Sequence, residues 1–375
     1  MNKKRLLMCY HSSEYGGVEK QILDIIKGLS EKIEIIVVCP EGPMVKEYLS
    51  GGAIKHIALS PRHEADLQYA LQIRQLIILE KIDIVHSHEL LTGSLATFGG
   101  WLASFRKPVK RIYHVHTPFS WWRHNFLKSL PALFINTFVN FIVGNIFATD
   151  VLALTPSIKR HRIFNEFISP TKIRVLPNGI ENEYFSFSQL QRNSFRKKWR
   201  IPVDTFVIGN ISRFTKEKGH EVLINAFSQI KKQNPGKNML LLLAGGGILL
   251  NEIKSLSKNL GIYESVIFTD QFLESDKIGI LSSIDLFVFP SYAEGFGIAI
   301  LESMSMGIPT VASNLPVLKD VGGDAVIYAK TGDPSDFAAK MRAIPDVSSG
   351  VALLKRAEVF SMRNFIKNYS GLYNL

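Results

Sequence analysis

Two glutamates eight positions apart carry the most specific chemistry in the chain. Glu294 lies in the polar loop after an apolar run at 285–289, and Glu302 lies inside the helix that we expect to follow. Gly295 and Gly297 between them let the backbone approach a ligand, and a helix start offers free N–H groups and a positive dipole. Glu302 would lie roughly 7 Å along that helix. The stretch therefore predicts a diphosphate at the helix start, with one carboxylate near each flanking hydroxyl-bearing group.

Two cations could hold the same diphosphate. Arg213 and Lys218 flank the turn between an expected strand at 206–211 and an amphipathic helix. Arginine can bind phosphate through two parallel hydrogen bonds and lysine acts as a point charge, so the pair forms a suitable clamp. Two solvated surface cations would give the same pattern. The glutamate motif further along the chain favours the clamp.

The first half of the chain has its own candidates. Gly16 and Gly17 form a glycine-rich turn between a strand and a helix, without the GxGxxG spacing of a dinucleotide site, so a Rossmann dehydrogenase is not supported. A turn without a ligand would look the same. His116 follows an expected strand at 111–115, which is where a side chain of an active-site loop is expected.

Two further histidines raise the question of a metal site. His86 and His88 follow an expected strand at 82–85. We expect their side chains to lie on opposite faces of the strand, and no third ligand is evident in the sequence. The pattern is therefore interpreted as polar residues at a strand end, and no metal site is predicted.

The composition is that of a globular chain with two domains. It has 375 residues, of which 46% are hydrophobic and 21% charged. The only cysteines, Cys9 and Cys39, lie in apolar runs, so no disulfide framework is predicted. The N-terminal apolar run is too short for a signal peptide, and we expect the chain to stay in the reducing cytosol.

Basic and aromatic residues are concentrated in one segment. The net charge is +11, and residues 105–175 hold eleven lysines and arginines against two acids, 11 − 2 = +9. Trp121 and Trp122 lie in this stretch, whose composition fits an anionic membrane surface or nucleic acid. Residues 121–149 include an apolar run with a stripe of asparagines. This favours a helix at the membrane interface, then core packing, and least of all a membrane span.

The E-x7-E stretch with its glycines resembles the signature of the retaining GT-B glycosyltransferases, in particular family 4 (glycosyltransferase group 1). The R-x4-K-G element at 213–219, the PNG turn at 177–179 and the glycine pair resemble the same family, so the resemblance spans the whole chain. It implies an α/β GT-B fold: two Rossmann-like domains facing across a cleft, with a C-terminal helix returning to the first domain. The expected domains are 1–184 with about 361–375, and 185–360.

The resemblance also implies a reaction and a site. Sugar would pass, with retention, from a nucleotide-diphosphate sugar to an acceptor. His116, Glu294, Arg213 and Lys218 would be catalytic, and no metal or other cofactor would be needed. Donor-binding residues would be Gly16, Gly17, Arg213, Lys218, Glu294, Gly295, Phe296, Gly297, Ile298 and Glu302. The family usually has an acid after this histidine, where the chain has Thr117.

The acceptor is inferred from the basic, aromatic segment. It favours a lipid-linked saccharide at the inner face of the cell membrane, with the protein peripherally bound, and hence cell-surface polysaccharide biosynthesis. Two alternatives stay open: a GT-B sugar-nucleotide epimerase, and a non-catalytic module that binds nucleic acid or membrane. Nucleic acid is not expected as a partner, because the donor motifs would be left unexplained.

Overall fold

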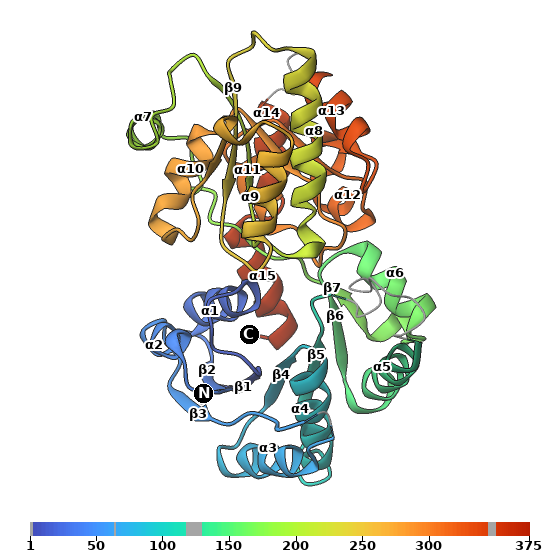
Figure 1. Cartoon of the computed structure of the whole chain (residues 1–375). Coiled ribbons are helices and arrows are strands. Elements are labelled where there is room, and N and C mark those ends of the chain that lie inside the picture. The colour runs from blue at the N-terminus through green and yellow to red at the C-terminus, as the bar shows by residue number, and fades with distance from the viewer. Residues whose placement is uncertain (1–2, 64, 118–129, 344–349) are drawn as a thin grey trace. The chain divides into compact units, whose positions relative to one another are not determined.

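The chain divides into two compact units. Unit 1 comprises Met1–Gly179 together with Arg363–Leu375, and unit 2 comprises Ile180–Met362. A computed structural model describes residues 3–63, 65–117, 130–343 and 350–375 (Figure 1). Each unit is built on one parallel sheet with helices between the strands, so the predicted α/β class is confirmed.

Unit 1 contains a seven-stranded parallel sheet with the order β3-β2-β1-β4-β5-β6-β7. The central strands are short and almost completely buried, as expected where helices cover a parallel sheet, whereas the two edge strands are partly exposed. The strands are β1 (Arg5–Cys9), β2 (Glu34–Cys39), β3 (Lys55–Ala58), β4 (Ile84–His88), β5 (Lys110–His114), β6 (Asp150–Ala153) and β7 (Ile173–Val175). The helices are α1 (Gly17–Leu29), α2 (Pro43–Ser50), α3 (Leu67–Leu79), α4 (Leu90–Ala103), α5 (Leu130–Ile142), a π-helical turn (Val143–Phe147), α6 (Pro156–Asn165) and α15 (Met362–Tyr373).

Unit 2 contains a six-stranded parallel sheet with the order β10-β9-β8-β11-β12-β13. Apolar side chains of α8, α9 and α13 pack on it to form one core. The strands are β8 (Phe206–Ile211), β9 (Met239–Ala244), β10 (Val266–Phe268), β11 (Leu286–Phe289), β12 (Thr310–Ser313) and β13 (Ile327–Ala329). The helices are α7 (Gln189–Lys198), α8 (His220–Gln233), α9 (Leu250–Asn259), α10 (Lys277–Ser283), α11 (Ile298–Ser305), α12 (Pro316–Gly322), α13 (Pro334–Ala343) and α14 (Gly350–Glu358).

The strand order places a switch point in each sheet. The chain moves outward from β1 to β3 and then returns to the other side of β1 at β4, and it does the same around β8 and β11. Ligands of open α/β sheets bind outside the carboxyl ends of the strands at such points. The loops after β8 and β11 carry the Arg213–Lys218 and Glu294–Glu302 motifs, so both predicted donor motifs lie at the switch point of unit 2.

The C-terminal segment differs from the single returning helix that the resemblance implies. It forms two helices, because α14 ends at Glu358 and α15 begins at Met362. The break is held by backbone hydrogen bonds of Ile180, whose N–H donates to Phe360 and whose carbonyl accepts from Met362. The second helix belongs to unit 1, where Tyr369 and Tyr373 are completely buried. The predicted return of the chain to the first domain is therefore confirmed, with a break that the periodicity did not reveal.

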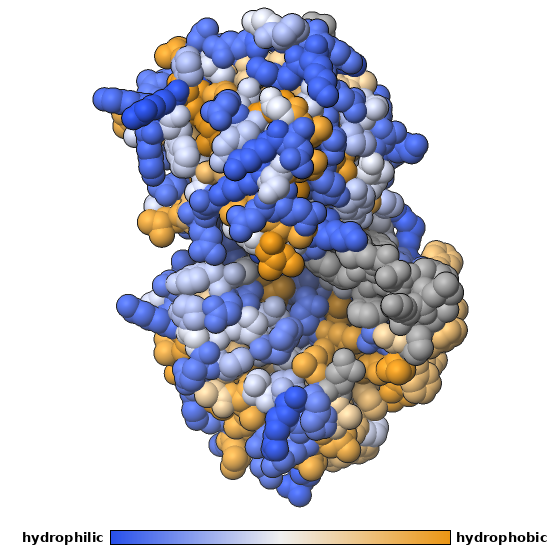
Figure 2. All heavy atoms as spheres, viewed as in Figure 1, coloured by the Kyte–Doolittle hydropathy of each residue, from blue (hydrophilic) through white to orange (hydrophobic). Residues whose placement is uncertain are grey.

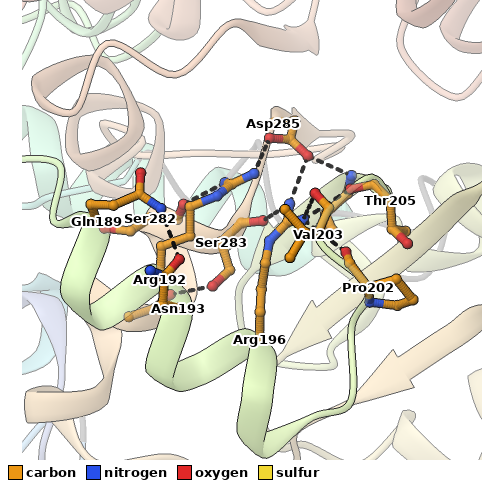
Figure 3. A network of polar contacts seen from close by, with 12 residues as sticks. Gln189, Arg192, Asn193, Arg196, Pro202, Val203, Thr205, Ser282, Ser283 and Asp285 are labelled. Atoms are coloured by element: carbon orange, nitrogen blue, oxygen red, sulfur yellow. Dashed lines mark hydrogen bonds and ion pairs between the residues drawn. The ribbon is translucent and has the colours of Figure 1, made fainter.

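A helix also forms in the stretch 181–200, which shows no strong periodicity. Ser188 caps α7 by accepting from the backbone N–H of Gln191. Arg192 and Arg196 then both reach Asp285, at 2.8 and 2.9 Å, as Figure 3 shows. Polar contacts of this kind, rather than an apolar stripe, hold α7 against the end of α10, and hydrophobic periodicity cannot detect them.

Asn140 of helix α5 and Asn145 of the π-helical turn after it bind polar groups of the protein itself. The side chain of Asn140 accepts a hydrogen bond from the Tyr113 hydroxyl at 2.7 Å, and Asn145 binds the backbone of Phe167 and Ser169. The asparagines therefore face the protein and the phenylalanines of α5 face outward. In the part of the chain that the structure describes, no helix has the length and apolar character needed to cross a membrane. Trp121 and Trp122 lie outside the described residues.

Candidate functional site

The two motif loops of unit 2 are joined at the carboxyl ends of β8 and β11. The backbone N–H of Tyr292 donates to the carbonyl of Glu217 at 2.7 Å. Gly219 has φ +64°, and a Cβ there would lie 2.3 Å from the carbonyl oxygen of Pro290. Only glycine allows this close approach in a left-handed conformation. The contact fixes the Arg213–Lys218 turn beside the loop that carries Glu294.

Lys218 and Glu294 form an ion pair at the centre of this arrangement. Their Nζ and Oε1 atoms lie 2.6 Å apart, and the side chains are only 15% and 8% exposed. Lys218 Nζ also lies 5.5 Å from the centre of the Phe289 ring. A partly desolvated ammonium beside a carboxylate can attract phosphate and, at the same time, hold the carboxylate in one orientation. The structure thus brings together two of the predicted catalytic residues.

The second glutamate of the motif has its own lysine. Lys277, the first residue of α10, lies 3.0 Å from Glu302 Oε1 and 2.8 Å from Glu274 Oε1. Burial alone would lower the pKa of this lysine. The nearby carboxylates of Glu302 and Glu274 have the larger combined effect, so that its pKa is raised above the ordinary value. The ammonium is therefore firmly charged, and it orients the buried carboxylate of Glu302. The sequence did not point to Lys277, because it is 25 residues from Glu302 and belongs to no motif.

Helix α11 begins where the sequence predicts a diphosphate. Gly297 immediately precedes it with φ +89°, and a Cβ at that position would lie 2.6 Å from Leu318 Cδ2. Phe296 is buried and its ring meets the ring of Phe360 edge-on. Gly295 and Ile298 are half-buried. The start of α11 is thus fixed by packing, and its free N–H groups lie in the loop that carries Glu294.

Arg213 is placed differently. Its side chain is exposed, and no ion pair joins it to any residue that the structure describes. The residue follows β8 by two positions and precedes the Lys218 turn, so its backbone is near the switch point while its side chain remains free to move. The structure therefore brings Lys218, but not Arg213, into contact with the glutamate motif.

The glycines at 245–247 let the loop after β9 pack closely against the backbone of the turn after β8. A Cβ on Gly245 would lie 2.2 Å from the carbonyl oxygen of Ser212, and one on Gly247 would lie 2.6 Å from that of Phe214. Phe214 N–H also donates to Gly246 at 2.9 Å. The loop after β9 therefore supports the turn that carries Arg213, because its glycines allow a close approach to the backbone of that turn.

His220 packs directly behind the Lys218 turn. Its ring stacks on Phe214 at 4.0 Å and its Nε2 lies 3.2 Å from the Ser212 hydroxyl. Burial, assisted by the nearby charge of Lys218, lowers its pKa to about 3. The ring is therefore neutral at physiological pH.

This burial predicts an acid-sensitive unit 2. The unfolded chain binds a proton to His220 below about pH 6.5, whereas the folded chain does not until about pH 3, so stability present above pH 6.5 is lost as the pH falls. Between pH 7 and pH 5 we expect a loss of about 2 kcal/mol through this residue. The pH dependence of denaturant unfolding should be correspondingly shallower in His220→Gln. Identical slopes in both proteins would contradict the expectation.

The predicted residues of unit 1 lie at its own switch point. Gly16 and Gly17 are exposed at the start of α1, directly after the loop that follows β1. Glu19 in the first turn of α1 is buried and accepts a hydrogen bond from Ser12 at 2.6 Å. The glycine pair is thus backed by a buried carboxylate at a helix start, which is a favourable place for negative charge.

His116 is buried just beyond β5. Its Nε2 lies 3.0 Å from Nδ1 of His88, and its ring stacks on that of His114 at 4.0 Å. Burial, with Arg162 nearby, lowers its pKa to about 3, so the ring is neutral at physiological pH. Its backbone N–H donates to the carboxylate of Glu89, whose pKa burial raises to about 7. Glu89 has φ +62°, a conformation that costs a non-glycine residue energy and that the sequence did not indicate.

The expectation for His86 and His88 is wrong. Residues two positions apart on a strand point to the same face, and these two rings stack at 4.3 Å. His114, opposite His88 on the neighbouring strand, lies on that face as well. The sequence could have revealed this, because alternation in HSH and HVH places His86, His88 and His114 on one face of β4 and β5, with His116 just beyond β5 on the same side.

Both halves of the chain match families of glycosyltransferases. Residues 15–184 match the family described as Glycosyltransferase Family 4, and residues 191–347 match Glycosyl transferases group 1. The chain is 28% identical over 332 residues to the capsular polysaccharide biosynthesis glycosyltransferase CapM of Staphylococcus aureus, an alignment covering 84% of this chain and 81% of the relative. It is 26% identical over 300 residues to alpha-monoglucosyldiacylglycerol synthase of Streptococcus pneumoniae, covering 78% and 66%.

A solved structure with a similar fold is that of Anabaena HepE in complex with UDP-glucose. The TM-score is 0.79 with 20% sequence identity, and the match covers 99% of this chain and 100% of the other. The predicted GT-B fold is confirmed by this likeness together with the two parallel sheets.

Proposed function

Because the chain belongs to the group 1, family 4 glycosyltransferases, we propose that it moves a sugar, with retention, from a nucleotide-diphosphate sugar to a lipid-linked saccharide in cell-surface polysaccharide biosynthesis. One observation carries the donor half of the proposal: the partly buried pair of Lys218 and Glu294 joins the turn after β8 to the loop that precedes α11, at the switch point of unit 2. In support, CapM is a capsular polysaccharide biosynthesis glycosyltransferase, and HepE, of similar fold, has been solved in complex with UDP-glucose.

The chemistry follows from charge. Cleavage of the anomeric bond leaves positive charge on the sugar ring and negative charge on the departing diphosphate. The ammonium of Lys218 and the N–H groups at the start of α11 would stabilise the diphosphate, with Arg213 able to close onto it from the surface. Such preorganised electrostatics is usually the largest catalytic contribution. Glu294 would bind the sugar hydroxyls and stabilise the developing positive charge. Glu302, oriented by Lys277, would bind the ribose hydroxyls.

Unit 1 would supply the acceptor side. The exposed glycine pair Gly16 and Gly17 lets a substrate approach the start of α1, and the neutral ring of His116 could contact the transferred sugar. The carboxylate of Glu89, held by the backbone of His116, could accept a hydrogen bond from an acceptor hydroxyl. The leaving phosphate would act as the base, so the proposed reaction uses no metal ion and no further cofactor.

An apolar surface of unit 1 supports a membrane-bound acceptor. Phe134 and Phe138 of α5 are 73% and 65% exposed, and Phe164 and Phe167 at the end of α6 are 72% and 66% exposed. In Figure 2 apolar residues gather over α5. Exposed aromatic side chains combined with the positive charge of residues 105–175 suit the surface of an anionic membrane. We therefore propose peripheral binding at the inner face of the cell membrane, which would keep the protein cytoplasmic.

This surface predicts a measurable effect. The double variant Phe134→Ser/Phe138→Ser should bind vesicles of anionic phospholipid at least about tenfold more weakly, because burial of each phenylalanine contributes roughly 1.5–3 kcal/mol. Co-sedimentation at low salt measures the partition. The matched control is Leu190→Ser/Leu273→Ser in unit 2, where the side chains are 80% and 72% exposed, and it should bind as the wild type does. Equal weakening by both variants would argue against the surface on α5.

The donor site is tested by ligand-induced stabilisation. UDP, GDP, ADP and their sugar conjugates are added in the presence of EDTA, and the unfolding midpoint is measured. At about 100 times the Kd, the matching donor should raise the midpoint by roughly 5 °C or more in the wild type, and by much less in Glu302→Ala and Arg213→Ala. NMR of the glycoside formed on a lipid-linked acceptor should show the donor's anomeric configuration. Conversion of donor without any acceptor, or absence of binding by every nucleotide, would overturn the proposal.

A further inference from the structure

A cluster of histidines lies on one face of the unit 1 sheet and has no part in the donor chemistry. His86 and His88 of β4 and His114 of β5 are completely buried. His88 is paired in register with His114, and Met8 of β1 is paired with His86. Helices α3 and α4 pack on the opposite face, where Leu7, Val38 and Val85 belong to the apolar core. On the histidine face the contact is with α15, through Tyr373.

The three imidazoles lie close together, with the rings stacked or tilted against one another. One ring nitrogen from each residue lies within 4.8 Å of those from the other two. The rings lie at centroid distances of 4.3 Å for His86–His88, 5.3 Å for His88–His114 and 5.6 Å for His86–His114. A tetrahedral ion with imidazole ligands needs nitrogens roughly 3.4 Å apart, so modest ring rotations would complete the site.

The outward nitrogens of two of these rings are already held. Nδ1 of His86 lies 2.7 Å from the hydroxyl of Tyr373, and Nδ1 of His88 lies 3.0 Å from Nε2 of His116. This leaves Nε2 of His86 for a ligand, and Nε2 of His88 once its contact with the Met8 sulfur is exchanged for one. Histidines that bind metals typically use the second nitrogen in this way, which fixes ring orientation and tautomer. The thioether of Met8, 3.0 Å from Nε2 of His88, adds a soft donor on the same side.

The remaining nitrogens have no partner among the residues that the structure describes. Nε2 of His86 and both nitrogens of His114 are buried without a hydrogen bond to any described residue. A neutral imidazole carries one N–H donor and one acceptor, and leaving such a buried group unsatisfied costs about 1–3 kcal/mol. An apolar side chain at position 114 would avoid that cost. Two imidazoles with nitrogens unpaired among the described residues, beside a third on the same buried face, therefore indicate that something else binds them.

We infer that His86, His88 and His114 bind one late transition-metal ion, Zn²⁺ or Cu⁺, as a structural site of unit 1. Imidazole nitrogens suit both ions, and the neighbouring thioether of Met8 favours Cu⁺. Burial lowers the pKa of all three histidines, which keeps them neutral as metal binding requires. The ion would join β4 to β5 and, through Tyr373, to α15. The proposed transfer reaction does not involve it, so the two proposals can fail independently.

The test measures retained metal in the full chain. Because the site is closed, the protein is unfolded and refolded with Zn²⁺, or with Cu⁺ under reducing conditions, and then washed with a chelator that removes surface-bound ions. Mass spectrometry of the metal should give one ion per folded chain. X-ray absorption at the metal edge should show imidazole nitrogens, with a sulfur scatterer added if the ion also binds Met8. Mg²⁺ should not be retained.

Variants localise the site. His86→Gln and His114→Gln should each lower retention at least tenfold, whereas His220→Gln, a buried histidine of unit 2, should retain the wild-type amount. Tyr373→Phe should bind the ion 10- to 100-fold more weakly, because it removes the partner of His86. Circular dichroism confirms that each variant folds. Folded wild-type protein without stoichiometric metal, or retention unchanged in His114→Gln, would overturn the inference and leave a water network as the partner of these nitrogens.

Discussion

Replacement of Glu294 by glutamine is expected to lower kcat about 10²- to 10³-fold while the KM for the donor changes little. The substitution keeps the shape of the side chain but removes the negative charge that would face the sugar as it becomes positive. The magnitude is that of removing one preorganised electrostatic contact from a transition state. Loss of kcat and kcat/KM together is the mark of an interaction made only in the transition state. Steady-state kinetics over a range of donor concentrations measures both.

Glu302→Gln is the matched control. Both glutamates are buried, and each is paired with one lysine at 2.6 or 3.0 Å, so both substitutions remove a charge from a similar environment. If Glu302 binds the ribose, its loss weakens the binding of the substrate and of the transition state by the same amount. The KM should then rise about tenfold with kcat little changed, which corresponds to one hydrogen bond to a charged group. Retention of more than a tenth of the wild-type kcat in Glu294→Gln would refute the catalytic assignment.

The motif loops were predictable because local sequence determines them. Gly297 and Gly219 lie at positions with positive φ, and apolar runs of four to six residues lead into both loops. A strand, a glycine loop and an amphipathic helix follow one another within a short segment in each case. The parallel sheet then brings the carboxyl ends of neighbouring strands to one edge, so that Lys218 meets Glu294 across 76 residues of sequence.

The remaining parts of the site depend on contacts that no local pattern encodes. Lys277 reaches Glu302 only in the folded unit, because 25 residues of sequence separate the two. The strained conformation of Glu89 arises where β4 meets the loop after β5, through the hydrogen bond from Glu89 N–H to the carbonyl of His114. The histidine cluster is different, since strand alternation alone predicts a shared face, and it was missed through a wrong assignment of faces.

The polar network between α7 and β11 yields the largest expected effect on stability. Asp285 accepts from Arg192 and Arg196 and from the backbone N–H of Val207 at 2.8 Å (Figure 3). Arg196 is 5% exposed and also donates to the carbonyls of Thr205 and Ser283. These contacts attach the polar helix α7 to unit 2, so removal of their common acceptor should affect the whole unit.

Asp285→Ala should therefore lower the unfolding free energy of unit 2 by about 3 kcal/mol or more, because it leaves a buried guanidinium without its carboxylate. Asp270→Asn is the control in the same unit: Asp270 pairs with Lys254 but is 58% exposed, and such a pair contributes less than about 1 kcal/mol. Calorimetry of the full chain, with the unit 2 transition identified by its shift with donor nucleotide, measures both. Equal shifts in the two variants would mean that the carbonyl acceptors around Arg196 compensate for the lost carboxylate, and α7 would then be held by its backbone contacts alone.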